Sequence, residues 1–202
     1  MISAKKQSRR QSKRRNHTLV LLGVGLVFIA LTTLLKPFYS TQLWLSDQLF
    51  LSETPSPNIV VSGIDDATLQ AYGKWSDWPR RLHAQALDNL AKAGARAIGF
   101  DILFADSSAD DAVFATAIEN AGKVVLPIAG SQPLSLTGSM ETYTNIIMPV
   151  PALSDVSRAT GHVNISPDRD NKVRSLPLVI QDTSGKIYPS FILSAQIIIV
   201  PA

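Results

Sequence analysis

A run of seventeen uncharged residues near the amino terminus constrains this chain more than any other feature of its sequence. Residues 19–35 (LVLLGVGLVFIALTTLL) contain no charged side chain, and Lys36 follows them directly. A helix needs about 17 to 25 mainly apolar residues to cross a bilayer, at a rise of about 1.5 Å per residue. Because the run is apolar on every face, it lacks the polar stripe of a helix half-buried in a soluble core. We therefore predict a transmembrane helix over residues 18–36, with the lipid bilayer as its partner.

Charge is distributed unequally on the two sides of this helix. The first 36 residues carry eight Lys and Arg and no acid, whereas residues 37–202 carry eleven bases and sixteen acids, a net charge of −5. Positive residues mark the cytoplasmic side of a membrane helix. We therefore place residues 1–17 in the cytoplasm as a basic tail, and the rest outside. This predicts a single-pass protein of the inner (cell) membrane with a periplasmic or extracellular domain and no nucleic-acid partner.

A cleaved signal peptide is the main alternative to a membrane anchor. Such a peptide has an apolar core of about 7 to 15 residues followed by small residues at a cleavage site. Here the core is longer and is followed by Lys36-Pro37-Phe38-Tyr39. The pair Arg9-Arg10 is similar to a twin-arginine signal, but the polar Ser12 stands where that signal needs apolar residues. The anchor is therefore the favoured interpretation.

The segment after the membrane predicts a short helix and a linker over residues 37–57. In residues 38–51, Leu45, Leu49 and Phe50 are spaced as one helical face. Residues 54–57 (TPSP) end this helix, because each proline lacks an N–H and restrains the residue before it. We predict that a globular extracytoplasmic domain occupies residues 58–202.

Short apolar runs alternate with helical patterns in the first half of this domain. Buried strands are predicted over residues 59–64, 97–104 and 123–128. Helices are predicted from Pro79 to Gly94 and over residues 110–121, where a glycine supplies the left-handed stop in each case. The fold class is therefore α/β: a transmembrane helix, then a parallel or mixed β-sheet with flanking helices, in three layers with a Rossmann-like start.

The second half of the domain is less regular. We predict loops over residues 129–160, with one strand near 146–150. Two further strands are predicted over 161–165 and 173–181, joined by a turn at 166–172. A final helix is predicted from Pro189 to about residue 198. Its expected inward residues are Phe191, Ile192, Ala195 and Ile199.

An ordered set of short motifs runs through the domain. They are Val61-Ser62-Gly63-Ile64-Asp65-Asp66, Tyr72-Gly73-Lys74-Trp75, Trp78-Pro79-Arg80, His83-Ala84, Ala93-Gly94-Ala95, Ile98-Gly99-Phe100-Asp101, Gly161-His162-Val163-Asn164, Asp168-Arg169-Asp170-Asn171 and Tyr188-Pro189-Ser190. From about Asp47 to Gln196 the chain resembles the type-two CHASE domain, an extracellular sensory module associated with cyclases and histidine kinases. One departure is Asn171, where the family usually has glycine. Asn tolerates a positive φ, so the turn can be retained.

The resemblance implies a sensor that passes a signal to an output module. Members of the family place further membrane helices and a cytoplasmic output domain after the sensor, for example a cyclase, a diguanylate cyclase or a histidine kinase of a two-component system. Neither lies within these 202 residues. The sequence is therefore a fragment, a truncated gene product or a stand-alone module, and its last residues leave open whether the domain is complete. We expect a homodimer that receives an unknown small-molecule or other extracytoplasmic signal.

The candidate ligand-binding residues lie at predicted strand ends. Asp65 and Asp101 end two predicted parallel strands, and ligands of open α/β sheets bind beyond such ends. Arg80, at the start of the next helix, can pair with one of them or bind an anionic ligand. Asp66 and Trp78 complete the candidate set. The structural alternatives are an Asp–Arg pair that holds the helix, a helix-capping carboxylate and a tryptophan that closes the core edge.

The sequence offers little support for catalysis. It has no cysteine, and it lacks G-x-S-x-G, H-E-x-x-H and P-loop motifs. The acidic run from Asp168 lacks the glycine and the final glutamate of a calcium loop. We therefore predict no catalytic residue, no metal and no cofactor. Two other functions stay open: a membrane-anchored periplasmic hydrolase that uses Asp65, Asp101 and His162, and a structural or assembly ectodomain.

Overall fold

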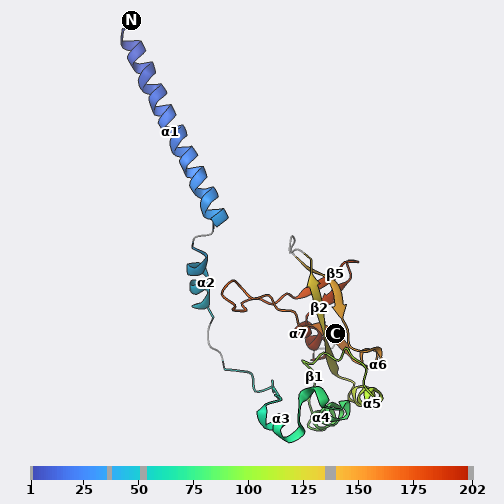
Figure 1. The fold of residues 1–202 in the computed structure, drawn as a ribbon. Helices are drawn as coiled ribbons and strands as arrows, with labels where there is room; N and C mark the ends of the chain where they lie inside the picture. Colours follow the sequence, from blue (N-terminus) through green and yellow to red (C-terminus); the bar gives the residue numbers. More distant parts are fainter. Residues whose placement is uncertain (1, 36–37, 51–53, 135–139, 200–202) are drawn as a thin grey trace. The chain divides into compact units, whose positions relative to one another are not determined.

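The computed structural model describes residues 2–35, 38–50, 54–134 and 140–199. Its internal contacts divide the chain into two units, Met1–Ser62 and Gly63–Ala202. Figure 1 traces both along the sequence.

The described part of the first unit contains two helices and a segment without helix or strand. Helix α1 spans Ile2–Leu35 and so includes the basic tail as well as the apolar run. Its window His17–Leu34 has a mean hydropathy of 2.1 and no buried residue, and it is long and apolar enough to cross a membrane. The predicted apolar helix is therefore confirmed, while Lys36 lies outside the described residues. Helix α2 spans Tyr39–Asp47, so Leu49 and Phe50 lie beyond its end rather than on its face.

The predicted strand over residues 59–64 is wrong for this structure. These residues form no helix or strand, and Val61 is 88% exposed. Ile59 and Val60 are also exposed. A β-branched run favours a strand only where a neighbouring strand accepts its hydrogen bonds, and this segment pairs with none of the described strands.

The second unit holds the other predicted elements of the first half. The helices are α3 (Asp66–Tyr72), the 3-10 turn η1 (Trp75–Asp77), α4 (Arg80–Lys92) and α5 (Asp111–Ala121). Gly94 follows α4 with φ 86°, and Gly122 ends α5 with φ 64°. Both left-handed positions suit glycine, which has no Cβ to clash there. The two predicted helices and their stops are confirmed.

A parallel sheet of three strands lies at the centre of this unit. Strand β1 (Ile98–Gly99) and strand β4 (Ala159–His162) both pair in parallel with β2 (Val124–Pro133). Val125 of β2 is opposite Gly99 of β1 and Ala159 of β4. The β1 strand is much shorter than the predicted span of 97–104, whereas β2 is longer than predicted. The parallel arrangement itself is confirmed.

Helices α4 and α5 cover one face of this sheet with the main hydrophobic core. They bury Leu87, Phe114 and Ile118 completely, together with Val124 and Leu126 of β2. Successive strand residues point to opposite faces, so Val124 and Leu126 face the same helices. Val113 of α5 is 52% exposed and lines a shallow groove between α4 and α5.

Helix α7 (Phe191–Ile199) packs on the opposite face of the sheet. Gly161 makes this contact possible, because a Cβ there would lie 2.6 Å from Cα of Phe191. Ser194, almost fully buried, donates its hydroxyl to the carbonyl of Thr160 at 2.9 Å. Helices on both faces make the predicted three layers. Ile192, expected to face inward, is exposed, and the side chain of Ile199 lies outside the described residues.

The second half of the unit extends the sheet with antiparallel and parallel pairs. Past Ile128, β2 pairs in antiparallel fashion with β3 (Glu141–Ile147), which pairs in parallel with β5 (Val179–Asp182). Strand β6 (Ile187–Pro189) pairs with β5, and α6 (Pro151–Ser154) precedes β4. The prediction of mainly loops over 129–160 is therefore wrong. Residues 141–147 are polar and weakly patterned, yet they form a strand because they pair with β2. The sheet as a whole is mixed.

Candidate functional site

Asp65 and Asp66 lie at the amino end of helix α3. The Asp65 carboxylate accepts hydrogen bonds from the backbone N–H and the hydroxyl of Thr68, at 2.9 and 2.7 Å. The hydroxyl bond and then the N–H bond hold the pKa of Asp65 below its usual value. Asp66 is the exposed first residue of the helix. Asp65 is thus a helix cap, which is one of the structural alternatives predicted for it.

Arg80 is a buried cation, with 8% of its surface exposed. Its guanidinium pairs with the carboxylate of Asp111, at the start of α5, and donates to the carbonyl of Asp106. The same group lies over the ring of Phe104, 5.4 Å from its centre. The pairing of Arg80 with Asp65 or Asp101 is therefore replaced by a pairing with Asp111. Arg80 fastens the first turn of α4 to the loop after β1 and to α5.

Trp78 belongs to an aromatic cluster around His83. Its indole N–H donates to the carbonyl of Gly73 at 3.0 Å, and its ring centre lies 5.1 Å from that of Trp75. The imidazole of His83, in turn, contacts the rings of Trp75 and Phe104 at 5.3 Å each. Burial, and then the nearby Arg80 cation, lower the pKa of His83. Trp78 therefore closes the edge of the core.

Asp101 is exposed in the loop that follows β1. Because β1, β2 and β4 are parallel, their carboxyl ends lie at one edge of the sheet, where α/β domains bind ligands. Asp101 is at this edge. A pocket shared with Asp65 depended on a strand over residues 59–64, which this structure does not form. The shared pocket stays a prediction.

At the same edge, just after strand β4 ends, the side chain of Asn164 forms hydrogen bonds to the backbone of β2. Its amide N–H donates to the carbonyl of Gly130 at 2.8 Å, and its oxygen accepts from the N–H of Gly130 at 2.7 Å. Strand β2 pairs with β4 up to Ile128 and with β3 from Ala129 onward. The two bonds of Asn164 stand in for backbone hydrogen bonds at this change of partner. The ring of Tyr143 lies so close to Gly130 that a Cβ there would be 2.5 Å from it. A larger residue at position 130 would have to displace this ring.

Glu141 organises the polar groups beside this junction. Its carboxylate accepts from the hydroxyl of Tyr143 at 2.7 Å and from that of Ser166 at 2.6 Å. Burial, followed by the bond to Glu141, raises the pKa of Tyr143 to about 12. The tyrosine therefore stays a neutral donor over the physiological range. Sequence reasoning missed this junction, since Asn164 bonds to Gly130 across 34 residues and Ser166 to Glu141 across 25.

Residues 163–178 leave the sheet as a long arm without helix or strand (Figure 1). Near its tip, Arg174 pairs with Asp168 at 2.8 Å and with Asp170 at 2.7 Å. The hydrogen bond from Arg174 is the main cause that lowers the pKa of Asp170 to about 2. Asn171 has φ 60°, so the predicted tolerance of asparagine for this turn is confirmed. These contacts hold the tip of the arm in a defined shape.

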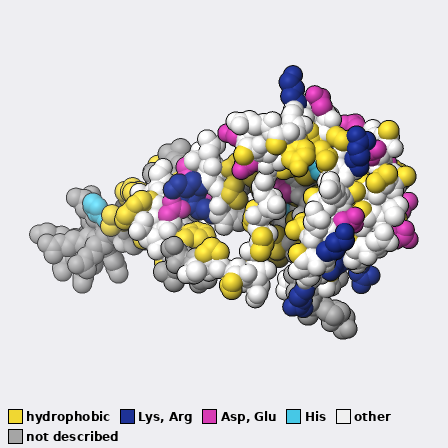
Figure 2. Space-filling model, turned by 90° about the horizontal axis from the view of Figure 1, so that it is seen from below, with side chains coloured by type: hydrophobic (Ala, Val, Ile, Leu, Met, Phe, Trp, Pro, Cys, Tyr) yellow, Lys and Arg dark blue, Asp and Glu magenta, His cyan; other side chains and the backbone are white. Residues whose placement is uncertain are grey.

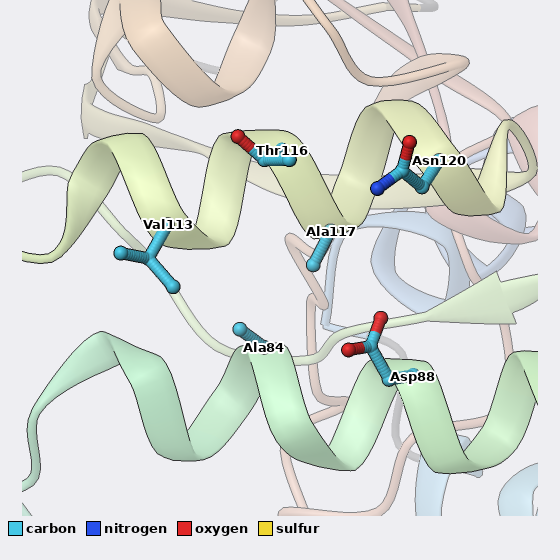
Figure 3. A pocket seen from close by; sticks show the side chains of 6 residues that line it. All are labelled: Ala84, Asp88, Val113, Thr116, Ala117 and Asn120. Atoms are coloured by element: carbon cyan, nitrogen blue, oxygen red, sulfur yellow. The ribbon is translucent and has the colours of Figure 1, made fainter.

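A shallow groove runs between α4 and α5, with a volume of about 340 Å³. The buried alanines Ala84 and Ala117 form its floor, and the carboxylate of Asp88 and the amide of Asn120 lie along its rim (Figure 3). Small floor residues let the two helices approach closely. None of the predicted site residues lines it.

The described residues do not assemble a catalytic or metal-binding constellation. No group of three or more His, Asp or Glu in them is placed to hold a metal. His162 is only 2% exposed and cannot reach a substrate in solution, so the geometry does not support the hydrolase alternative. On the face in Figure 2, Lys and Arg side chains are scattered among acidic and apolar ones rather than gathered in a stripe.

The second unit is thus an α/β domain with a polar junction at its sheet edge, and an exposed apolar helix precedes it in the sequence. The model of the CHASE2 domain family matches residues 21–199, most of the chain. The chain therefore belongs to the CHASE2 family, whose domains are extracellular, sensory and non-catalytic. No curated protein and no solved structure matches it significantly. The resemblance stated from the motifs is confirmed.

Proposed function

We propose that this chain is the membrane-anchored signal-input part of a transmembrane receptor. Its α/β domain lies outside the inner membrane, and the apolar part of helix α1 crosses the membrane to the short basic tail in the cytoplasm. The output module, a cyclase, a diguanylate cyclase or a histidine kinase, is supplied by further chain or by a partner protein. The family match over residues 21–199, which includes most of the apolar helix, carries this proposal.

The signal acts by shifting the population of two domain conformations. A ligand changes such an equilibrium only by as much as its affinity for the two states differs. The carboxyl edge of the parallel strands is the proposed place of binding, with the exposed carboxylates of Asp66 and Asp101 as contacts and Asp65, Trp78 and Arg80 as supporting residues. Two copies respond together as a homodimer. Asp101→Asn should then change the signal dose needed for half-maximal output while leaving the melting temperature within about 2 °C, as expected for a surface substitution.

Topology is tested most simply through cysteine labelling, because the natural chain has no cysteine. Ser107→Cys, in the exposed loop after β1, should react with a membrane-impermeant maleimide in intact spheroplasts. Ser8→Cys, in the tail, should react only after the membrane is broken. The protein should stay with membranes after an alkaline wash and keep an amino-terminal tag. The reverse labelling pattern, or loss of the tag by cleavage, would contradict the proposal.

A further inference from the structure

His162 is the most unusual buried polar residue in the described part of the chain. It is the last residue of strand β4 and lies opposite Ile128 of β2. Only 2% of its surface is exposed, and both Nδ1 and Nε2 are buried without a hydrogen-bond partner among the described residues. Since Gly161 faces α7, the alternation of the strand places the His162 side chain on the opposite face of the sheet.

A buried imidazole with no acceptor beside it stays neutral. Burial lowers the pKa of His162, and the negative charge of Glu141 opposes this effect in part. Glu141, on β3, is the charged group whose field reaches the ring, and its carboxylate already accepts bonds from the hydroxyls of Tyr143 and Ser166. From β2 the backbone neighbour is the apolar Ile128, and from the residue before α7 it is the neutral Ser190. A proton on this ring would therefore add a second N–H donor and a charge to a ring that has no hydrogen-bond partner among the described residues.

The same residue is joined to the first turn of α7. The backbone of His162 forms a parallel bridge with Ser190, and Ser190 accepts from the N–H of Ser194 at 2.9 Å. The residue before it, Gly161, touches the backbone of Phe191. A displacement of the end of β4 should therefore also displace Ser190 and the first turn of α7. No comparable link exists at His83, whose described contacts are with aromatic rings and the Arg80 cation.

We propose that His162 is a proton-operated latch, so that mild external acidity protonates its ring and loosens α7 from strand β4. The inference rests on the proposed function, because it names the proton as a signal that this ectodomain receives. The step is the addition of one proton to the neutral imidazole, with no other bond formed or broken. In the open conformation, water accepts the two N–H bonds of the imidazolium.

The direction of the pH dependence follows from the two states of the ring. The pKa is below its ordinary value in the closed conformation and returns toward about 6.5 when the site opens to water. The closed conformation is thus fully favoured above about pH 6.5 and loses its advantage as the pH falls through that value. Each unit by which the two pKa values differ shifts the opening equilibrium tenfold at low pH.

Hydrogen exchange and NMR of the full chain in lipid nanodiscs test the latch. At pH 5, after correction for the intrinsic rate, the amides of Leu193 and Ser194 should exchange at least tenfold faster than at pH 7.5. The imidazole signal of His162 should titrate with the same midpoint as this opening. His162→Gln, which keeps a neutral polar side chain, should abolish the acid effect on α7. His83→Phe is the matched control and should keep it.

Three results would overturn the latch. The first is faster exchange of the α7 amides at pH 5 that persists in His162→Gln. The second is loss of this acid-dependent exchange in His83→Phe but not in His162→Gln. The third is a titration of the His162 imidazole that leaves α7 exchange unchanged. Should His162→Gln fail to fold, the wild-type comparison of the titration and exchange midpoints still decides. Failure of the latch leaves the topology labelling unaffected, whereas reversed labelling removes the proposed function but not the coupling of His162 to α7.

Discussion

The two halves of the α/β unit are built on different principles. Residues 63–128 contribute most of the main core, and the cation that they bury, Arg80, is paired with a carboxylate and a carbonyl. Residues 129–199 contribute few buried apolar side chains. Their junctions depend on side-chain amides and hydroxyls, and they bury His162 without a partner. We therefore expect the first half to keep its conformation and the second half to open more easily.

This difference indicates where a sensor of this kind can move. Local opening requires few buried apolar contacts, because each such contact adds to the free energy of opening. The helices α4 and α5 with β1 and the first part of β2 therefore form a rigid base. We expect the end of β4, α7 and the arm of residues 163–178 to form the part that opens more easily.

The largest predicted effect is on the buried ion pair of the first half. Asp111→Asn leaves the Arg80 guanidinium buried without its counter-charge, which should lower the free energy of unfolding by about 3–5 kcal/mol. Asp110→Asn is the matched control, because its pair with Arg81, at 3.3 Å, is largely exposed on the arginine side and is worth at most about 1 kcal/mol. Urea unfolding of both variants measures the difference. Equal losses would show that Arg80 is not held by Asp111.

A smaller effect is expected where α7 meets the sheet. Gly161→Ala places a Cβ against the backbone of Phe191, which cannot move aside like a flexible side chain. The free energy of unfolding should fall by about 1–3 kcal/mol, and the amides of α7 should exchange faster. Gly63→Ala is the control, since nothing lies within 4 Å of its Cβ position. Unchanged α7 exchange in Gly161→Ala would argue against the close contact.

In the arm of residues 163–178, we expect a substitution to change the ionisation of one carboxyl group rather than the stability of the whole domain. The pKa of Asp170 is about 2, and Arg174→Gln should return it toward about 3.9. A lowered carboxyl pKa contributes stability that is present above about pH 4 and is lost as the pH falls toward 2. NMR titration of the carboxyl carbons measures both proteins. An Asp170 pKa that stays near 2 in the variant would rule out the arginine as its cause.

The smallest effect concerns Tyr143 at the β2–β3 junction. Its hydroxyl should ionise at about pH 12, and Glu141→Gln should lower this value because the charged acceptor is removed. The raised pKa contributes stability that is present below about pH 10 and is lost as the pH rises toward 12. Ultraviolet absorbance at high pH follows the ionisation, with Tyr143→Phe to identify the signal. An unchanged midpoint in Glu141→Gln would leave burial as the sole cause.

The same contrast explains which elements the sequence predicts. Helices α4 and α5 and the start of β2 follow from local periodicity and from Gly94 and Gly122, because each buries an apolar face in the same core. The family motifs were equally readable. The predicted strand at 59–64 shows the limit of this reasoning. A β-branched run indicates a strand only when a pairing edge is available, and pairing is not a local property.

The polar junctions were not predictable for a related reason. Asn164 bonds to Gly130 across 34 residues, and Arg80 pairs with Asp111 across 31. The sequence identified Arg80 as a residue that needs a carboxylate but offered Asp65 and Asp101, which end predicted strands. The partner that the fold supplies begins a helix instead. The sequence placed His162 in a family motif and in a possible hydrolase site, and neither interpretation predicts a ring that lacks a hydrogen-bond partner among the described residues.

Native-state hydrogen exchange of the full chain in nanodiscs at pH 7.5 tests the contrast between the two halves most directly. The account predicts that the slowest amides lie in α4, α5 and residues 124–128 of β2, and that they open only with global unfolding. Residues 159–162, the first turn of α7 and residues 163–178 should open at lower free energy, as a separate step. A single free energy of opening for both halves would contradict the account.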